Sequence, residues 1–597
     1  MPTEETCNPR KRQRQENNER PSYPRKRAVQ ACHTCRQKRI KCDNEKPVCG
    51  SCVGLAMPCI YRENDKSTFD PASILILQRL DTLEELVRRS TLSPGSLPAT
   101  PDPSLAQGTL QNQLSPPAEG RLQALERTES STLYHINVES ILSWPVFQTC
   151  NIAQKHDLRA LLQQPNEIPE QHYLPVSLEF ENGGARQLLQ RFIRHVHIYN
   201  PVLEIGKVQE YMRDTLFDGL VNLKAFVIGS AHSHQLLIYA LGTISGPPDS
   251  QSSSPSSSLD IRQSEEFKKA EAYFLAARKR MGVLLGGSGI IEAQCFFLAG
   301  VYLMATLRPF QAWSMFVQAL VCCEGFNSPI PPSDANHDEK HTLRESIYWT
   351  CFKSELELRL ELGVGKTSCL DLTYPALFPS PPKDLEIQGE TVWYFYLAEI
   401  ALRRLGNRVL NYVYNCKPFG KSAELETTRE FEGQTHGLLN SLPGLLKPDT
   451  PSEEAQAKDE EHSALRFILK GHAIDCFEMV YWPFIFDAIH EGLPCDPELV
   501  EFTRKGLHIC ASRIGNNKAG FYYRHHGTWL MLRSCTRSAL VLCGAARRGL
   551  VTLLPPRWKN GVEQVMQMLR YWSLEANDIA SQLEILEDMI KDIPEDC

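Results

Sequence analysis

The chain has 597 residues, a hydrophobic content of 42% and a formal net charge of −7. This length argues against a single small domain, and this share of apolar residues suffices for a large core. The charge is divided unevenly: residues 1–63 hold 14 Lys and Arg against 7 Asp and Glu, so they carry +7 and the remainder carries −14. A basic head on an acidic body is expected of a protein that meets a polyanion at one end.

Residues 1–31 are polar, basic and poor in large apolar side chains, which predicts a disordered segment. They show no apolar stretch of the secretory kind, so the 20 cysteines of the chain are expected in a reducing compartment. Basic clusters at 10–14 and 25–27 are typical of nuclear import signals and phosphate contacts, although a solvated tail has the same composition.

The stretch 32–59 contains six cysteines with the spacing C-x2-C-x6-C-x6-C-x2-C-x6-C. Structural zinc sites are tetrahedral and are closed by four protein ligands, with thiolate preferred. Six thiolates cannot fill the eight positions around two such ions unless two of them are shared. The repeated half-motif therefore predicts a site for two zinc ions with the ligands Cys32, Cys35, Cys42, Cys49, Cys52 and Cys59.

Metal binding is also the expected source of folding energy for this stretch. Its large apolar residues are few, namely Ile40, Val48, Val53, Leu55 and Met57. A disulfide framework conflicts with the absence of a secretory signal, and a redox Cys-x-x-Cys pair needs a surrounding α/β fold that the sequence does not show.

The stretch resembles the binuclear zinc-cluster DNA-binding domain of fungal transcription factors, in its cysteine spacing and in the basic residues between the second and third cysteines. The resemblance implies that Cys32 and Cys49 bridge the two ions. It also implies recognition of a CGG triplet in double-stranded DNA, read in the major groove.

Four basic residues are candidates for the DNA contact. Lys38 and Arg39 stand where the family places its base-contacting pair, and both residue types can donate to guanine O6 and N7. Arg36 and Lys41 are better placed for phosphates, which position the domain without specifying sequence.

Residues 63–90 are interpreted as a linker followed by a short dimerisation helix. The apolar residues Ile76, Leu80, Leu83 and Val87 follow the 4, 3, 4 spacing of a coiled-coil seam. Only about two heptads are present, so an ordinary amphipathic helix is the alternative. Position favours a homodimer, because the family that the cysteines resemble dimerises just after its zinc cluster. Residues 91–130 are rich in Pro and Ser and indicate a flexible tether.

Residues 131–597 are predicted to be all-α. Apolar residues recur at helical spacing and show no sustained alternation, as in 188–204, 270–285, 292–307, 311–323 and 343–362. Polar interruptions at 246–258, 327–336 and 447–462 predict surface loops. The stretch 293–307 is too short to span a bilayer, so we expect a buried helix and no membrane partner.

Two parts of this body invite a functional interpretation. Residues at about 185–415 resemble the middle-homology region, the regulatory domain of the same fungal factors. The run 575–597 has eight acidic residues against one lysine, with apolar residues interleaved. This composition suits an acidic activation segment. It also suits a terminal amphipathic helix that closes the core, which we favour.

Together these features predict a multi-domain chain: a small zinc-stabilised helical module, a short coiled coil, a flexible linker and a large all-α regulatory domain. We expect a nuclear, dimeric, sequence-specific regulator of RNA polymerase II genes that works with co-regulators. By likeness, its targets would be a metabolic or secondary-metabolite gene cluster. No catalytic constellation emerges, so no enzyme is predicted. The alternative is a ligand-sensing receptor or enzyme-like body with a DNA-binding appendage, which an enclosed, polar-lined pocket would favour.

Overall fold

The computed structural model describes two sets of residues. In the N-terminal part these are 34–35, 38, 42–43, 48–55 and 57–59; thereafter they are 136–148, 157–163, 182–210, 228–245, 258–327, 337–364, 379, 389–415, 425–447, 459–591 and 593. The chain divides into two compact units, Met1–Ile74 and Leu75–Cys597. The predicted dimerisation residues Ile76, Leu80, Leu83 and Val87 and the tether 91–130 lie outside the described residues.

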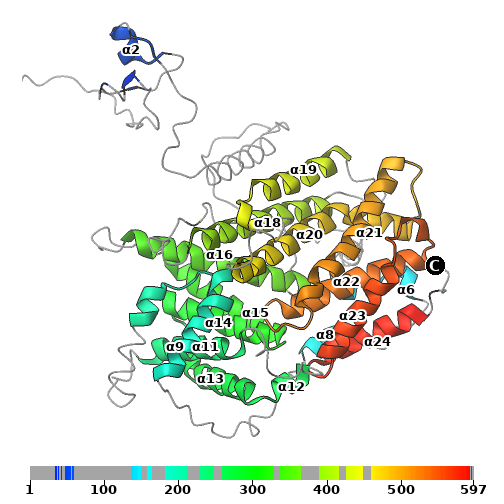
Figure 1. Ribbon diagram of the computed structural model, residues 1–597, viewed down its shortest axis with the longest axis horizontal. Helices are drawn as coiled ribbons and strands as arrows, with labels where there is room; N and C mark the ends of the chain where they lie inside the picture. The colour runs from blue at the N-terminus through cyan, green and yellow to red at the C-terminus, as the bar shows by residue number, and fades with distance from the viewer. Residues whose placement is uncertain are drawn as a thin grey trace, which may run out of the picture. The chain divides into compact units, whose positions relative to one another are not determined.

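The second unit, called the helical body below, consists of α-helices, and its described residues include no strand (Figure 1). Its α-helices are α5 (Val138–Leu142), α6 (Pro145–Gln148), α8 (Leu158–Gln163), α9 (Asn182–His195), α11 (Ile228–Ile244), α12 (Ser258–Arg262), α13 (Glu265–Met281), α14 (Ile290–Ala305), α15 (Pro309–Glu324), α16 (His337–Leu362), α18 (Glu390–Asn415), α19 (Leu425–Ser441), α20 (Asp459–His490), α21 (Pro497–Asn517), α22 (Thr528–Arg547), α23 (Trp558–Trp572) and α24 (Asn577–Lys591). Short 3-10 helices are η2 (His197–Tyr199), η3 (Gly282–Leu284), η4 (Gly325–Asn327), η6 (Gly444–Leu446), η8 (Lys518–Gly520) and η9 (Val551–Leu553).

The all-α prediction is confirmed, and one predicted helix proves shorter than its apolar pattern. Segment 188–204 is helical only to His195, where α9 ends. The 3-10 helix η2 follows, and Asn200 then adopts φ −142° and ψ 86°. The next residue is Pro201, and a proline disfavours helical geometry in the residue before it. The apolar residues beyond the helix, Val202 and Leu203, are nevertheless buried.

Local signals explain where several helices begin. The Ser264 side chain accepts a hydrogen bond from the Phe267 N–H at the start of α13, whose first turn is acidic and whose last turn is basic. Pro309 occupies the first turn of α15, where a missing N–H does no harm. A capping serine and a first-turn proline therefore mark the starts of these two helices in the sequence.

Helices that follow one another in sequence pack against one another, as α14, α15 and α16 do, and likewise α20, α21 and α22 (Figure 1). The close approach of α14 and α15 requires Gly300, because a Cβ atom there would lie 2.4 Å from the Phe316 ring. A larger core joins helices from both ends of the helical body, and a smaller one lies mainly between α18, α19 and α20.

Two predicted helices, a buried one within 293–307 and a terminal one within 575–597, are confirmed by this packing. Residues 293–305 of the apolar stretch lie in α14 and are all buried. No helix among the described residues is long and apolar enough to cross a membrane. The acidic C-terminal run forms α24, and its Ile579, Leu586 and Met589 are fully buried in the larger core.

Candidate metal centre and the cavity of the helical body

Five of the six predicted zinc ligands lie in the described residues, and their sulfur atoms form two overlapping groups. The first group is Cys35, Cys42 and Cys49, and the second is Cys49, Cys52 and Cys59; within each, the sulfurs all lie within 4.8 Å of one another. The sixth, Cys32, lies outside the described residues. Cys49 belongs to both groups, which is the position that a shared ligand must take.

The sulfur spacing fits tetrahedral zinc. Ligands at a Zn–S distance of about 2.3 Å stand about 3.8 Å apart around a tetrahedron. Within the first group, the Cys35 Sγ lies 3.6 Å from the Cys49 Sγ. No disulfide joins any cysteine that the structure describes, so these sulfurs are available as thiolates. The donor set therefore fits zinc, whose binding would hold the two half-motifs together.

Backbone N–H groups aim at these sulfurs. The Cys52 N–H donates to the Cys49 Sγ at 3.4 Å, where Cys49 caps the short helix α2 (Gly50–Gly54). The Cys49 N–H donates to the Cys59 Sγ at 3.3 Å. These two contacts hold the Cys49 and Cys59 sulfurs in place relative to the backbone.

Two polar contacts join residues of this short unit that are separated in the sequence. The Thr34 hydroxyl donates to the Pro58 carbonyl at 2.6 Å, and the Gly50 N–H donates to the Asp43 carboxylate at 2.8 Å and 3.1 Å. A Cβ atom at Gly50 would lie 2.5 Å from an Asp43 carboxylate oxygen, so glycine permits this contact.

Among the described residues of this unit, the buried core consists of cysteines. Cys35, Cys49 and Cys52 are fully buried, whereas Val53 and Leu55 are 65% and 55% exposed. Without an apolar core among its described residues, the unit needs metal binding for its folding energy.

Of the four predicted DNA-contacting residues, the structure describes only Lys38. Its N–H donates to the Thr34 carbonyl at 3.1 Å, one helical turn earlier, and its side chain is exposed. Arg36, Arg39 and Lys41 lie outside the described residues.

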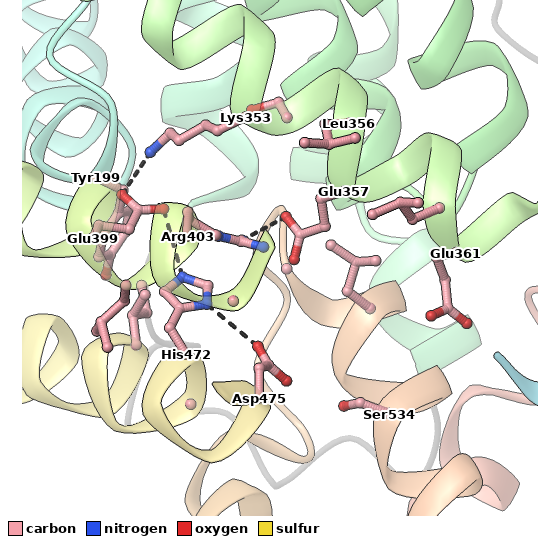
Figure 2. Close-up of a pocket in the computed structure, with 18 of the residues that line it drawn as sticks. Tyr199, Lys353, Leu356, Glu357, Glu361, Glu399, Arg403, His472, Asp475 and Ser534 are labelled. Atoms are coloured by element: carbon pink, nitrogen blue, oxygen red, sulfur yellow. Dashed lines mark hydrogen bonds and ion pairs between the residues drawn. The ribbon is translucent and has the colours of Figure 1, made fainter. Parts of the chain in front are cut away.

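The helical body contains a cavity of about 280 Å³ that the sequence interpretation did not predict. Figure 2 shows four ionisable side chains linked across it. The Lys353 ammonium lies 2.5 Å from Glu399, and His472 lies 3.5 Å from Glu399 and 3.4 Å from Asp475. These residues come from α16, α18 and α20, so the cavity is where three helices bring charges together.

The hydrogen-bond partners of His472 favour its protonated form. Burial and the Arg403 guanidinium oppose protonation, but hydrogen bonds with Asp475 and Glu399 outweigh them and raise the pKa of His472. Burial also opposes the charge of Glu399, yet Lys353 and His472 hold the pKa of this carboxyl well below its usual range. The cluster therefore holds its carboxylates ionised at neutral pH.

A second set of buried ion pairs continues from this cluster. Arg513 joins Asp475 to Glu478 at 2.7 Å each, and Arg537 joins Glu478 to Glu361 at 2.7 Å and 3.2 Å. The sequence carried one signal for these residues: in 355–362, charged side chains alternate with leucines inside an otherwise apolar helical pattern. That alternation indicates charged side chains on a helix whose neighbouring residues are buried. It does not identify the residues with which these charges pair.

Comparisons with known proteins agree with the geometry of the N-terminal unit. Residues 30–68 match the family described as the Fungal Zn(2)-Cys(6) binuclear cluster domain. Over 81% of its length the chain is 23% identical to a protein of Aspergillus rugulosus named transcription factor ecdB, of which the match covers 82%.

Other relatives match over short segments. The chain is 36% identical to the quinic acid utilization activator of Emericella nidulans, over 11% of this chain and 9% of that protein. It is 30% identical to the ABC-transporter-regulating transcription factor of Aspergillus oryzae, over 18% of this chain and 12% of that protein.

The class of protein follows from the sulfur geometry and these matches together. Residues 30–68 are a zinc-binding Zn(2)-Cys(6) cluster domain. The chain that carries this domain is similar to fungal proteins named as transcription factors and activators, and the described residues that follow the domain in the sequence are helical.

Proposed function

We propose that the chain is a nuclear, sequence-specific regulator of RNA polymerase II genes that binds DNA as a homodimer, each head holding two zinc ions. The observation that carries this proposal is the presence of Cys49 in both sulfur groups. A shared thiolate is what six ligands need to hold two tetrahedral ions. By the family likeness, Cys32 is the second shared ligand.

We assign base reading of a CGG triplet to Lys38 and Arg39, and phosphate contacts to Arg36 and Lys41. The exposed side chain of Lys38 supports this assignment. Phosphate contacts supply affinity that falls with salt, and base contacts supply discrimination. Pairing through Ile76, Leu80, Leu83 and Val87 would raise affinity for paired triplets through effective concentration.

We assign the segments of the chain accordingly: a basic segment at 1–31, the cluster domain at 32–62, linker and dimerisation helix at 63–90, tether at 91–130 and a regulatory body at 131–597. We infer a regulator rather than an enzyme because the relatives are named as transcription factors and activators. The names of two relatives, which mention quinic acid utilization and an ABC transporter, support control of metabolic or transport genes.

Selection of binding sites from random DNA with residues 1–95 tests which bases the protein recognises. We expect paired CGG triplets at a fixed spacing. Arg39→Ala should relax discrimination at one base position, costing roughly 1–3 kcal/mol there. Lys46→Ala, a basic residue outside the 36–41 run, is the matched control and should keep the selected sequence.

The dimer is tested separately. Deletion of residues 74–89 should abolish preference for paired triplets while binding to a single triplet persists. An Arg39→Ala loss that is uniform over all sequences would instead make Arg39 a phosphate contact. Unchanged pairing after the deletion would place the dimer interface elsewhere.

A further inference from the structure

The cavity of the helical body has the size and walls of a small-molecule site. Its volume of about 280 Å³ lies near the lower end of the roughly 300–1,000 Å³ usual for such sites. Side chains of α14, α16, α18, α20 and α22 line it. Much of the wall is apolar, including Phe297, Trp349, Phe352, Leu356, Phe395 and Met479. An apolar body of modest size would fit against this wall.

The charges that line the cavity are already matched. Besides His472, whose ring contacts Glu399 and Asp475, four cations and four carboxylates line it, and each of these cations contacts one of these carboxylates. The pairs are Lys353 with Glu399 at 2.5 Å, Arg403 with Glu357 at 2.7 Å, Arg513 with Asp475 at 2.7 Å and Arg537 with Glu361 at 3.2 Å. A charged ligand would lose its hydration without gaining a free counter-charge, so this lining disfavours ions.

Uncharged hydrogen-bonding groups remain for a ligand. Burial lowers the pKa of His525 to about 3 and that of His526 to about 4, so both lining rings are neutral at pH 7. The His525 Nδ1 already accepts from the Gly527 N–H at 3.0 Å, so His525 offers its Nε2–H as a donor, whereas His526 offers one donor and one acceptor. The Nε–H donors of Arg403 and Arg513 also lack a hydrogen-bond partner among the described residues. Arg513 is 3% exposed, and a buried donor without an acceptor is costly.

We propose that this cavity binds an uncharged, mainly apolar small organic molecule that carries a hydroxyl or carbonyl oxygen. The aromatic and aliphatic wall takes the apolar body, and the oxygen accepts a hydrogen bond from the donors that line the cavity. The site lies wholly within the helical body, so it can be measured independently of DNA binding. A packed ligand here would join α16, α18 and α20, the helices whose ion pairs meet at this point.

Calorimetric titration of the full zinc-loaded chain at pH 7 tests the proposal with three probes that share one ring system: 1-naphthol, 1-naphthoate and naphthalene. We expect 1-naphthol to bind with one-to-one stoichiometry. The anion 1-naphthoate should bind at least about tenfold more weakly, because its charge finds no free partner. Naphthalene should bind roughly fivefold more weakly, since it lacks the oxygen.

Two serine variants locate the binding. Ser534 lines the cavity and donates to the Met531 carbonyl at 3.1 Å, so Ser534→Leu should fill the space and abolish 1-naphthol binding. Ser573, outside the cavity lining, makes the same bond to the Arg570 carbonyl at 3.0 Å, and Ser573→Leu should leave binding unchanged.

The three-probe comparison needs no variant, so it decides the proposal even if Ser534→Leu fails to fold. Absence of 1-naphthol binding to the wild-type chain, or binding of 1-naphthoate as tight as that of 1-naphthol, would overturn it. Equal loss of binding in both serine variants would also overturn it, because the probe would then bind outside the cavity.

Discussion

The zinc-cluster head and the helical body reach a folded state in different ways. In the part of the head that the structure describes, the buried side chains are cysteines, and Val53 is 65% exposed. In the helical body, five tryptophans are buried almost completely: Trp144, Trp349, Trp482, Trp529 and Trp572. A unit of some 30 residues cannot bury enough apolar surface to offset chain entropy, so a metal must replace the core. The larger unit has a large apolar core and can also hold buried charged side chains within it.

The buried charges are a second difference between the head and the helical body. Arg533 is fully buried and contacts Glu139 and Glu361, which lie 394 and 172 residues away in sequence. Taking such ions out of water opposes their mutual attraction, so the intact pairs add little net stability, whereas removal of one partner leaves a buried charge without compensation. In the head, by contrast, charge at the thiolates is what the metal requires.

Replacement of the shared zinc ligand should show the largest difference in effect between the head and the helical body. Cys49→Ser is expected to release both zinc ions and to weaken DNA binding by a factor of about 100 or more, because both sites lose a ligand. All 8 tryptophans lie in the helical body, so the denaturant transition followed by tryptophan fluorescence should not move. Zinc content, DNA anisotropy and this transition are the three measurements.

The exposed Cys495 supplies the control for that experiment. Cys495→Ser should retain both ions and full DNA binding. If Cys49→Ser kept one ion and normal affinity, Cys49 would not be a shared ligand.

Removal of a buried charge should damage the helical body and spare the head. Arg533→Met leaves Glu139 and Glu361 without their shared cation, and we expect a loss of about 3–5 kcal/mol in the free energy of unfolding. Arg429→Met is the matched control: Arg429 pairs with Glu498 at the surface, where an ion pair contributes about 0–1 kcal/mol. Urea denaturation of both variants compares them, and equal losses would show that burial of the pair is irrelevant.

Acid should destabilise the helical body through buried neutral histidines. Burial lowers the pKa of His197 to about 4, although a backbone contact with Leu203 opposes this, while the unfolded value is 6.5. The unfolded chain therefore binds the proton first, so this stabilisation is complete above pH 6.5 and declines as the pH falls towards 4. Between pH 7 and pH 4.5 we expect a decline of about 2–3 kcal/mol from His197.

Unfolding free energies across that pH range, measured by tryptophan fluorescence, check the prediction. His197→Asn should lose this share of the pH dependence, whereas a variant of the exposed His508 to Asn should keep it. A rise in stability on acidification would reverse the assigned sign.

The smallest effects test packing between neighbouring helices. A Cβ atom at Gly506 would lie 2.6 Å from Ile485, so Gly506→Ala should reduce stability by roughly 1–3 kcal/mol. Gly515 lies in the same helix with nothing within 4 Å, so Gly515→Ala should increase stability by about 0.5–1 kcal/mol. Denaturant midpoints report both, and two changes of the same sign would mean that helix propensity alone governs α21.

The head illustrates what a sequence reveals when its chemistry is local. The cysteines within 32–59 define their own site, because zinc needs nearby thiolates at defined spacing. The helical periods of 270–285 and 311–323 likewise predicted α13 and α15, since an amphipathic pattern follows from one helix and its buried face. The end of α9 was predicted less well, because apolar residues beyond the helix are buried in a different backbone conformation.

The metal chemistry of the head and the helical nature of the body could be predicted from the amino-acid sequence. Which buried charges meet, and where space remains between helices, became visible in the folded chain. Lys353 finds Glu399 across 46 residues, and Arg533 finds Glu139 across 394. Such partners are set by the packing of helices distant in sequence, and no local spacing encodes them. The two overlapping sulfur groups come from a single short stretch, whereas the cavity needs the whole helical body.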